Sequence, residues 1–180
     1  MAFIVRKEVV GSISSCTPTS CRLISIRISA RPHNITVIQV YAPTSDHEDE
    51  EIEQFYEQLD SIITKTPNKD ILVGQAIKSP DLYQYWVGAV GRIGIGPTND
   101  SGRRLLEFAN SHRLILANTR HPYKLSWTAT WHAPNGQVHN QIDFILIPNV
   151  SSPASTKQTQ DLSQVLASAA IMTTCLQPSS

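Results

Sequence analysis

Four polar residues stand at the ends of apolar runs, where side chains can line a cleft: Tyr41, Asn118, Thr130 and Asp143. Tyr41 follows a strand-like run, and its spacing alone is that of an aromatic covering the core. Asp143 has strand-like neighbours, which predicts a carboxylate on a strand. Asn118 and Thr130 could contact a ligand or could equally hydrogen-bond backbone groups at a strand end. Chemistry therefore depends on whether the strands bring these side chains together.

Two further groups of residues carry atoms that bind metals. Four consecutive acids at positions 48–51 open an amphipathic pattern, and carboxylates in the first turn of a helix favour its positive dipole end. We therefore assign the acids to the helix in preference to a metal site. His121, His132 and His139 lack a metal-ligand spacing such as HxxxH and are predicted to lie in exposed loops.

Length and charge limit the class of protein. The chain of 180 residues is long enough for one domain with a buried core. Lys+Arg and Asp+Glu are both 15, so the net charge is zero. Strong nucleic-acid binders carry a basic excess that neutralises phosphates, so the charge does not support a nucleic-acid partner.

Cysteines and apolar runs indicate the compartment. Cys16, Cys21 and Cys175 form no CxxC pair, which argues against a disulfide framework or a zinc site. Arg6 and Lys7 interrupt the first apolar run, and no run approaches the about 18 apolar residues of a membrane span. We predict an intracellular protein, nuclear or cytoplasmic, with no membrane partner.

Short apolar runs alternate with two helical patterns, which predicts the mixed α/β class. Residues 3–10 form the first candidate strand. Residues 23–28 and 35–40 flank the turn signal Arg31-Pro32-His33-Asn34, so an antiparallel hairpin is predicted. From Asp49 to Lys65, apolar residues recur every three or four positions, which predicts an amphipathic helix.

The middle of the chain contains one strand, one loop and one helix. Residues 71–73 have the pattern of a buried strand. Residues 83–99 are rich in glycine without the spacing of a P-loop and are predicted to form a surface loop. Asn99 can cap the following helix. The apolar residues of that helix are Leu105, Leu106, Phe108 and Ala109.

The last third of the chain is predicted to begin with strands and to end in a tail. Residues 114–117 form one strand, and the Asn-Gly pair in Pro134-Asn135-Gly136 predicts a hairpin between residues 127–132 and 138–147. After Pro148 the composition changes to Ser, Thr, Gln and Ala. We expect a domain over residues 1–148 and a disordered or weakly helical tail over 149–180.

Four phrases of the sequence are specific when they are taken together. They are Ile38-Gln39-Val40-Tyr41-Ala42-Pro43-Thr44, Glu53-Gln54-Phe55-Tyr56, Leu116-Ala117-Asn118-Thr119 and Asn140-Gln141-Ile142-Asp143-Phe144-Ile145-Leu146. Through them, residues 3–148 resemble the endonuclease domain of non-LTR retrotransposons, within the exonuclease/endonuclease/phosphatase superfamily, and host sequences of the craniofacial development protein 2-like type. The resemblance implies an α/β fold that is a partial four-layer αββα sandwich.

The resemblance also implies a chemistry. Proteins of this type hydrolyse phosphodiesters with a divalent metal, usually Mg²⁺, which takes oxygen ligands. Tyr41 matches the family's tyrosine, whose hydroxyl contacts the scissile phosphate. Asp143 matches the aspartate that orients the catalytic histidine. Asn118 and Thr130 match polar positions near the cleft. By this ancestry the substrate is DNA and the metal is Mg²⁺.

Departures from the family pattern remove much of this chemistry. The family's Gly-Asp-x-Asn is replaced by Gly74-Gln75-Ala76-Ile77, so both catalytic side chains are missing. Asp81 lies beyond Pro80 and would have to reach back from a loop. The motif with the metal-binding glutamate precedes the first residue of this sequence, and the family's Ser-Asp-His does not follow Asp143. We expect no cofactor in this chain.

The tail indicates how the last motif was lost. If the codons for Ala169-Ala170-Ile171-Met172-Thr173 are read one base earlier, they can encode Gly-Ser-Asp-His-Asp. In that frame only the final aspartate is obligatory, and the other residues are allowed. We therefore hypothesise that a frameshift replaced the last strand. The coding nucleotide sequence tests this, because other wobble bases at these codons would contradict it.

Three functions follow, in descending order of support. The first is a degenerate endonuclease-like domain, ancestrally a Mg²⁺-dependent phosphodiesterase and now without a competent site. The second is a noncatalytic module that binds nucleic acid or a protein. The third is a residual Mg²⁺-dependent endonuclease, which would need Asp81 or a second chain to complete its site.

Overall fold

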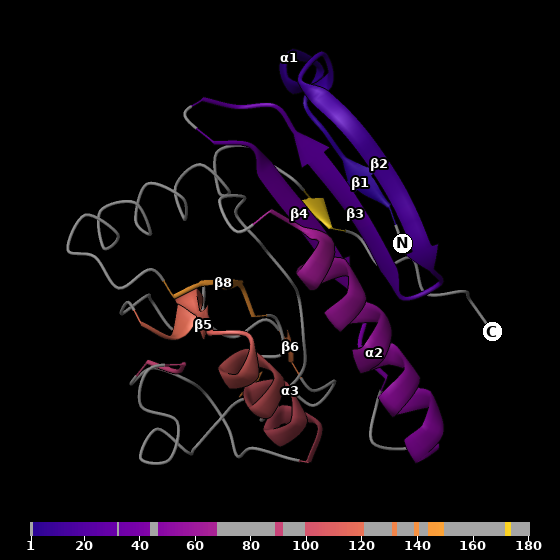
Figure 1. Ribbon diagram of the computed structural model, residues 1–180. Helices are drawn as coiled ribbons and strands as arrows, with labels where there is room; N and C mark the ends of the chain where they lie inside the picture. The colour runs from indigo at the N-terminus through magenta and orange to yellow at the C-terminus, as the bar shows by residue number, and fades with distance from the viewer. Residues whose placement is uncertain are drawn as a thin grey trace.

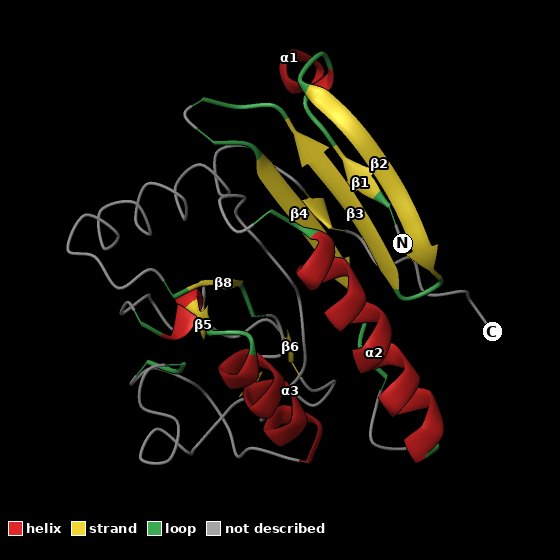
Figure 2. Ribbon diagram, in the orientation of Figure 1, coloured by secondary structure: helices red, strands yellow, loops and turns green. Residues whose placement is uncertain are grey.

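Antiparallel sheets and the helices that cover them make up the described part of the computed structural model (Figure 1 and Figure 2). The structure describes residues 2–31, 33–43, 47–67, 89–91, 100–120, 131–132, 139–140, 144–149 and 172–173. The mixed α/β class predicted from the sequence is confirmed. The elements are β1 (Phe3–Ile4), α1 (Lys7–Val10), β2 (Ile13–Ser20), β3 (Leu23–Ile28), β4 (Ile35–Val40), α2 (Asp49–Lys65), α3 (Asp100–Ser111), β5 (Leu114–Leu116), η1 (Ala117–Thr119), β6 (Trp131–His132), β7 (His139–Asn140), β8 (Leu146–Pro148) and β9 (Met172–Thr173).

The hairpin of β3 and β4 forms part of the first sheet, as predicted. The two strands are antiparallel and pair without a shift, from Leu23 opposite Val40 to Ile28 opposite Ile35. Asn34 Oδ1 accepts a hydrogen bond from the Ala30 N–H at 3.3 Å, which closes the turn. Because both faces of β4 carry buried apolar residues, each face of this sheet needs a covering layer.

The strand β2 was not predicted, and it pairs with β3 on the side away from β4. Its residues between Ile13 and Ser20 are all exposed, so it shows no apolar alternation. Pro18 lacks an N–H, and the pairing register shifts near both ends of the strand. This segment is a strand because its backbone pairs with the buried strand β3. The sequence of the segment alone gives no sign of that pairing.

The predicted strand over residues 3–10 is wrong. Only β1 is extended, and α1 forms a single short helix after it. Val5 and Val9 both pack against the buried cluster of Ile26, Ile28 and Val37. Val5 precedes α1 and Val9 lies within it, so both side chains reach this cluster without a continuous strand.

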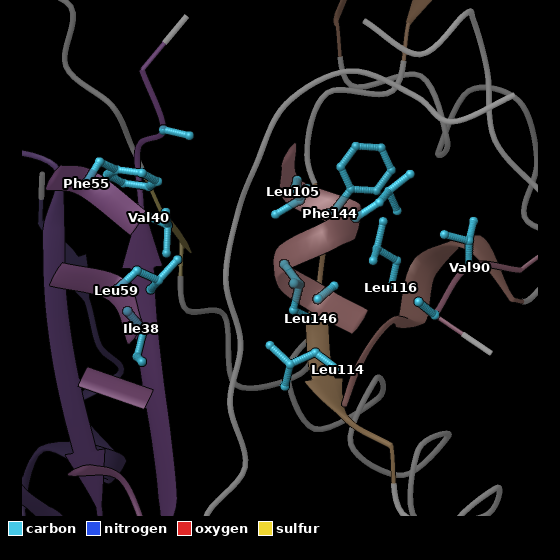
Figure 3. Packing of buried hydrophobic residues seen from close by; sticks show 14 of the residues in the cluster. Ile38, Val40, Phe55, Leu59, Val90, Leu105, Leu114, Leu116, Phe144 and Leu146 are labelled. Atoms are coloured by element: carbon cyan, nitrogen blue, oxygen red, sulfur yellow. The ribbon is translucent and has the colours of Figure 1, made fainter. Parts of the chain in front are cut away.

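The helix α2 has the bounds predicted from the sequence. Its buried residues Ile52, Phe55 and Leu59 lie on one face, and Phe55 and Leu59 point towards Ile38 and Val40 of β4 in Figure 3. The helix ends at Lys65, where the Thr66 hydroxyl donates to the Ile62 carbonyl at 2.8 Å. Thus α2 covers one face of the first sheet, and the cluster of Ile26, Ile28 and Val37 lies on the other.

The helix α3 covers a second sheet, formed by β5 and β8. These strands are antiparallel, with Leu116 opposite Leu146. Leu105, Leu106 and Ala109 of α3 belong to the same core as these leucines, which Figure 3 shows together with Phe144. The predicted strand over 114–117 is therefore confirmed except for its last residue, which begins η1.

The two helices lie side by side and form one layer. Asp49 of α2 pairs with Arg104 of α3 at 2.7 Å, and Asp60 of α2 lies 3.1 Å from His112, just after α3. The Tyr56 ring meets Phe108 between these contacts, with centroids 5.3 Å apart. A helix layer on antiparallel sheets is the portion of the predicted αββα sandwich that the described residues contain.

Two short pairings involve the last third of the chain. β6 pairs antiparallel with β7, as the predicted hairpin requires, and its Asn-Gly turn lies outside the described residues. The predicted strand over 138–147 is wrong as one element, because β7 and β8 belong to different sheets and residues 144–145 are not extended strand. β9 pairs antiparallel with β1. The predicted strand over 71–73, most of the loop over 83–99 and the Asn99 cap lie outside the described residues.

Candidate functional site

Tyr41 continues the pairing of β4 by one residue and then leaves the sheet. Its N–H donates to the Arg22 carbonyl at 2.9 Å. Its side chain is 41% exposed, and the Arg22 guanidinium carbon lies 5.7 Å from the ring centroid. This separation is within the range of a cation–π interaction. The structure therefore places Tyr41 at the surface with a cation against its ring.

Arg22 connects Tyr41 to the start of α2. Its Nη2 donates to Glu51 Oε1 at 2.9 Å and lies 2.9 Å from His47 Nε2. The same Glu51 oxygen is 4.0 Å from His47 Nε2. Arginine has no acceptor, so in a hydrogen bond at the shorter distance the acceptor is His47 Nε2. We name Arg22, Tyr41, His47 and Glu51 the Arg22 cluster.

The acids at positions 48–51 do not form a metal site. Asp49 pairs with Arg104, and Glu51 pairs with Arg22. In the part of the chain that the structure describes, no group of three or more His, Cys, Asp or Glu side chains could hold a metal ion. Mg²⁺ needs several oxygen ligands in one place. The described donor set therefore does not fit the metal that the family resemblance implies.

Asn118 lies in η1 and holds the chain just before β8. Its Oδ1 accepts a hydrogen bond from the Ile145 N–H at 3.1 Å, while the Ala117 N–H donates to the Ile145 carbonyl at 2.8 Å. These two bonds fix Ile145 against η1 and begin the pairing of β8 with β5. The side-chain oxygen of Asn118 thus satisfies a backbone group, which is one of its two predicted roles; ligand contact remains a prediction.

Thr119 is fully buried beside Asn118 and uses its hydroxyl twice. The hydroxyl donates to the Leu116 carbonyl at 2.7 Å and accepts from the Gly91 N–H at 2.7 Å. A Cβ on Gly91 would overlap the Thr119 carbonyl, so only glycine fits there. We name Leu116–Thr119, with their contacts to Gly91 and Ile145, the Thr119 turn. It ties three separate chain segments together.

A shallow pocket lies next to the Arg22 cluster, where Ala42 and Pro43 meet both helices. Tyr56 and Arg104 form part of its wall. Burial raises the pKa of Tyr56 to about 12, an effect that the Arg104 charge opposes and Glu107 reinforces. Tyr56 is therefore a neutral hydrogen-bonding group near neutral pH, without the low pKa of a general base.

Several predicted site residues lie outside the described residues. These are Thr130, Asp143, Asp81, His121 and the segment 74–78. For His132 and His139 the structure describes only backbone pairing. Tyr41 and Asn118 are described, and their contacts involve Arg22 and Ile145 respectively. Whether these residues face one cleft therefore stays a prediction.

Sequence analysis missed two polar residues that the structure makes prominent. Arg22 precedes a strand and resembles any surface cation in the sequence. Thr119 was part of a recognised phrase, but its partner Gly91 is 28 residues away. A glycine and a buried threonine at such separation give no local pattern. Only the fold shows that they touch.

The comparisons with known proteins agree with the resemblance read from the sequence. No protein-family model matches the chain. The chain resembles craniofacial development protein 2. That protein from Bos taurus is 38% identical over 151 residues, and the match covers 81% of this chain and 25% of the relative. Craniofacial development protein 2 of Tragulus javanicus is also 38% identical over 151 residues, and the match covers 26% of its length.

This chain therefore spans about a quarter of the curated relatives that it matches. Among solved structures, the endonuclease domain of TRAS1, a telomere-specific non-LTR retrotransposon, has a TM-score of 0.48 and 16% identity, covering 82% of this chain and 55% of that one. The AP endonuclease LMAP of Leishmania major has a TM-score of 0.48 and 10% identity, covering 79% and 55%. Within the described residues, no helix has both the length and the apolar character needed to cross a membrane.

Proposed function

We propose that the chain is an endonuclease-like domain of retrotransposon ancestry that does not cleave DNA. The observation that carries this proposal is Gly74-Gln75-Ala76-Ile77, which stands where the resembled family has Gly-Asp-x-Asn. The amide of Gln75 and the aliphatic side chain of Ile77 replace the two side chains that contact the phosphate and the attacking water. Neither can supply a carboxylate to a metal or position a nucleophile.

Loss of one part removes most of the activity because the parts act as a unit. In the ancestral Mg²⁺-dependent phosphodiesterase, Tyr41 would contact the phosphate and Asp143 would orient a histidine. Here both are vestigial, since the groups that they serve are gone. Asn118 and Thr130 are weak candidates for substrate contact, and the engagement of Asn118 Oδ1 by Ile145 leaves less of that side chain for a ligand.

The charges around the Arg22 cluster support the same proposal. The ion pairs of Asp49 and Glu51 occupy carboxylates that would otherwise be available as substitute metal ligands. Mg²⁺ bound only through such exposed acids would be weakly held. We therefore propose that the ancestral metal is no longer a cofactor of this chain.

Nicking of supercoiled plasmid tests the proposal. The purified chain is incubated with plasmid and Mg²⁺ beside its Asp143→Asn variant, prepared in the same way. We expect neither protein to convert supercoiled plasmid to the open circle faster than buffer. Nicking by the parent that the variant lacks would establish the residual endonuclease, completed by Asp81 or by a second chain.

The exposed ring of Tyr41 beside Arg22 favours a second function, noncatalytic binding of nucleic acid or a protein. The zero net charge weakens the nucleic-acid version, because phosphate binding draws on released counterions and a basic surface. Fluorescence anisotropy of a short duplex tests it. Binding that weakens as salt rises would favour nucleic acid over a protein partner.

We also propose the domain boundary near Pro148, with residues 149–180 as a tail that the domain does not need. Limited proteolysis followed by mass spectrometry tests this boundary. We expect early cleavage within 149–171 and a resistant fragment that ends near Pro148. Protection of the tail through its β9 pairing with β1 would place it inside the domain.

A further inference from the structure

Arg22 presents a guanidinium group that is fixed in place but only partly used. Its side chain is 18% exposed and is held by the Tyr41 ring, by His47 and by Glu51. Within the described residues, the two side-chain contacts of the guanidinium both come from Nη2. A guanidinium has five N–H donors arranged as a planar fork. The other N–H donors of the guanidinium make no side-chain hydrogen bond within the described residues.

We propose that the Arg22 cluster is a binding site for a phosphate group and that Glu51 keeps it closed. Glu51 Oε1 occupies a position 2.9 Å from Arg22 Nη2 and 4.0 Å from His47 Nε2. An oxyanion oxygen in that position would contact the guanidinium and lie near the imidazole. The carboxylate thus stands where a phosphate oxygen would bind.

Glu51 is suited to be displaced. Its side chain is 47% exposed, and exposed ion pairs are among the weakest polar contacts in proteins. Its backbone stays fixed in the first turn of α2, so only the side chain has to rotate. Arg22 is far less exposed and keeps the Tyr41 ring as a support. The site can therefore open without a change of fold.

Phosphate is a better competitor for this fork than a carboxylate of the chain. Arginine binds phosphate and carboxylate through paired N–H donors, and inorganic phosphate offers more oxygens and more charge than a carboxylate, whereas a phosphodiester carries the same single charge. The exposed acids Glu48 and Glu50 lie beside Glu51 in the sequence and oppose the approach of any anion. Because Glu51 occupies the site and the neighbouring acids repel anions, we expect the parent chain to bind phosphate weakly.

The inference goes beyond the proposed loss of cleavage and does not depend on it. No metal and no bond breaking are involved, so binding can be measured without Mg²⁺. If the chain nicked plasmid, the phosphate site at Arg22 would still be tested separately, by its own binding measurement. Free phosphate and the phosphodiester of DNA share the chemistry that the fork would bind, and separate probes distinguish them.

The test follows the Arg22 Nε–Hε resonance by NMR during titration with inorganic phosphate, in the parent and in Glu51→Gln. Removal of the competing carboxylate should tighten phosphate binding about three- to five-fold, the range of an exposed ion pair. Glu53→Gln removes the same charge from the same helix, and residues two positions apart do not share a helix face. We expect this control to bind phosphate as the parent does.

A second variant, Arg22→Lys in the Glu51→Gln background, keeps the charge and removes the fork. We expect it to lose the gain, and unchanged circular dichroism will show that the fold is kept. An equal gain in Glu53→Gln, or no gain in Glu51→Gln, would overturn the proposal. The same titrations with a short duplex DNA show which source of phosphate binds; an Arg22-dependent gain with either probe supports the site.

Discussion

The Arg22 cluster and the Thr119 turn use similar polar groups in opposite surroundings. In the cluster, side chains contact one another at the surface, and Tyr41 and Glu51 are both exposed. In the turn, the Thr119 hydroxyl and the Asn118 amide oxygen bind backbone groups, and Thr119 is completely buried. Water can replace the contacts of the first region more easily than those of the second, which are partly or fully buried.

This difference separates residues available for binding from residues committed to folding. A buried donor or acceptor that loses its partner costs about 1–3 kcal/mol, whereas an exposed ion pair contributes about 0–1 kcal/mol. A polar side chain near an ancestral cleft is therefore not evidence of binding in itself. Its partners and its exposure decide which role it has.

Gly91→Ala should give the largest effect and would break the Thr119 turn. Its Cβ would overlap the Thr119 carbonyl, which is backbone and cannot move aside alone. We expect a loss of about 3 kcal/mol in the free energy of unfolding, the upper range for overpacking. Urea denaturation followed by circular dichroism measures it. Gly11→Ala is the matched control, because a Cβ there meets nothing within 4 Å; equal losses in both variants would contradict the proposed clash.

Thr119→Val should have the next largest effect. Valine keeps the shape of threonine but leaves the Gly91 N–H and the Leu116 carbonyl without this hydroxyl. We expect a loss of about 2 kcal/mol in the free energy of unfolding. The same denaturation experiment on Thr119→Ser, which keeps the hydroxyl, should show a smaller loss. A valine variant as stable as the parent would show that the hydroxyl contributes little.

Glu51→Gln should have the smallest effect on stability. It tests the difference between the exposed Arg22 cluster and the Thr119 turn. The ion pair with Arg22 is partly exposed, and its removal should lower the free energy of unfolding by less than about 1 kcal/mol. The difference from the parent should shrink further as salt is raised, because salt screens exposed charges. A loss as large as that of Thr119→Val would mean that the cluster is structural.

Periodic and locally coded elements of the fold were predicted well from the sequence. The bounds of α2 follow from its apolar period and its acidic first turn, and the β3–β4 hairpin follows from alternation on both sides of a turn signal. β2 was missed because an exposed strand needs no apolar face. Residues 3–10 were misread as one strand because their apolar residues are shared between a short strand, the residues after it and a short helix, and Val5 and Val9 are only partly buried.

The candidate site was predicted less completely than the fold. The spacing of Tyr41 predicted an aromatic that covers the core, whereas its side chain is 41% exposed. Its partner Arg22 comes from another strand connection, and the contacts of Arg22 with Glu51 and of Thr119 with Gly91 join residues 29 and 28 positions apart. Contacts of this kind depend on which strands pair. No spacing rule within one element can supply them.

The Thr119 turn has a consequence for how this chain can diverge. Folding constrains Gly91 and Thr119 whether or not the chain cleaves anything, because Thr119 is buried and position 91 admits no larger side chain. Tyr41 has no such protection, since an exposed side chain is free to change once its chemistry is lost. A domain that stops being an enzyme therefore keeps its ancestor's scaffold residues longest. The similarity of such a domain to its relatives can therefore be recognised after the catalytic activity has been lost.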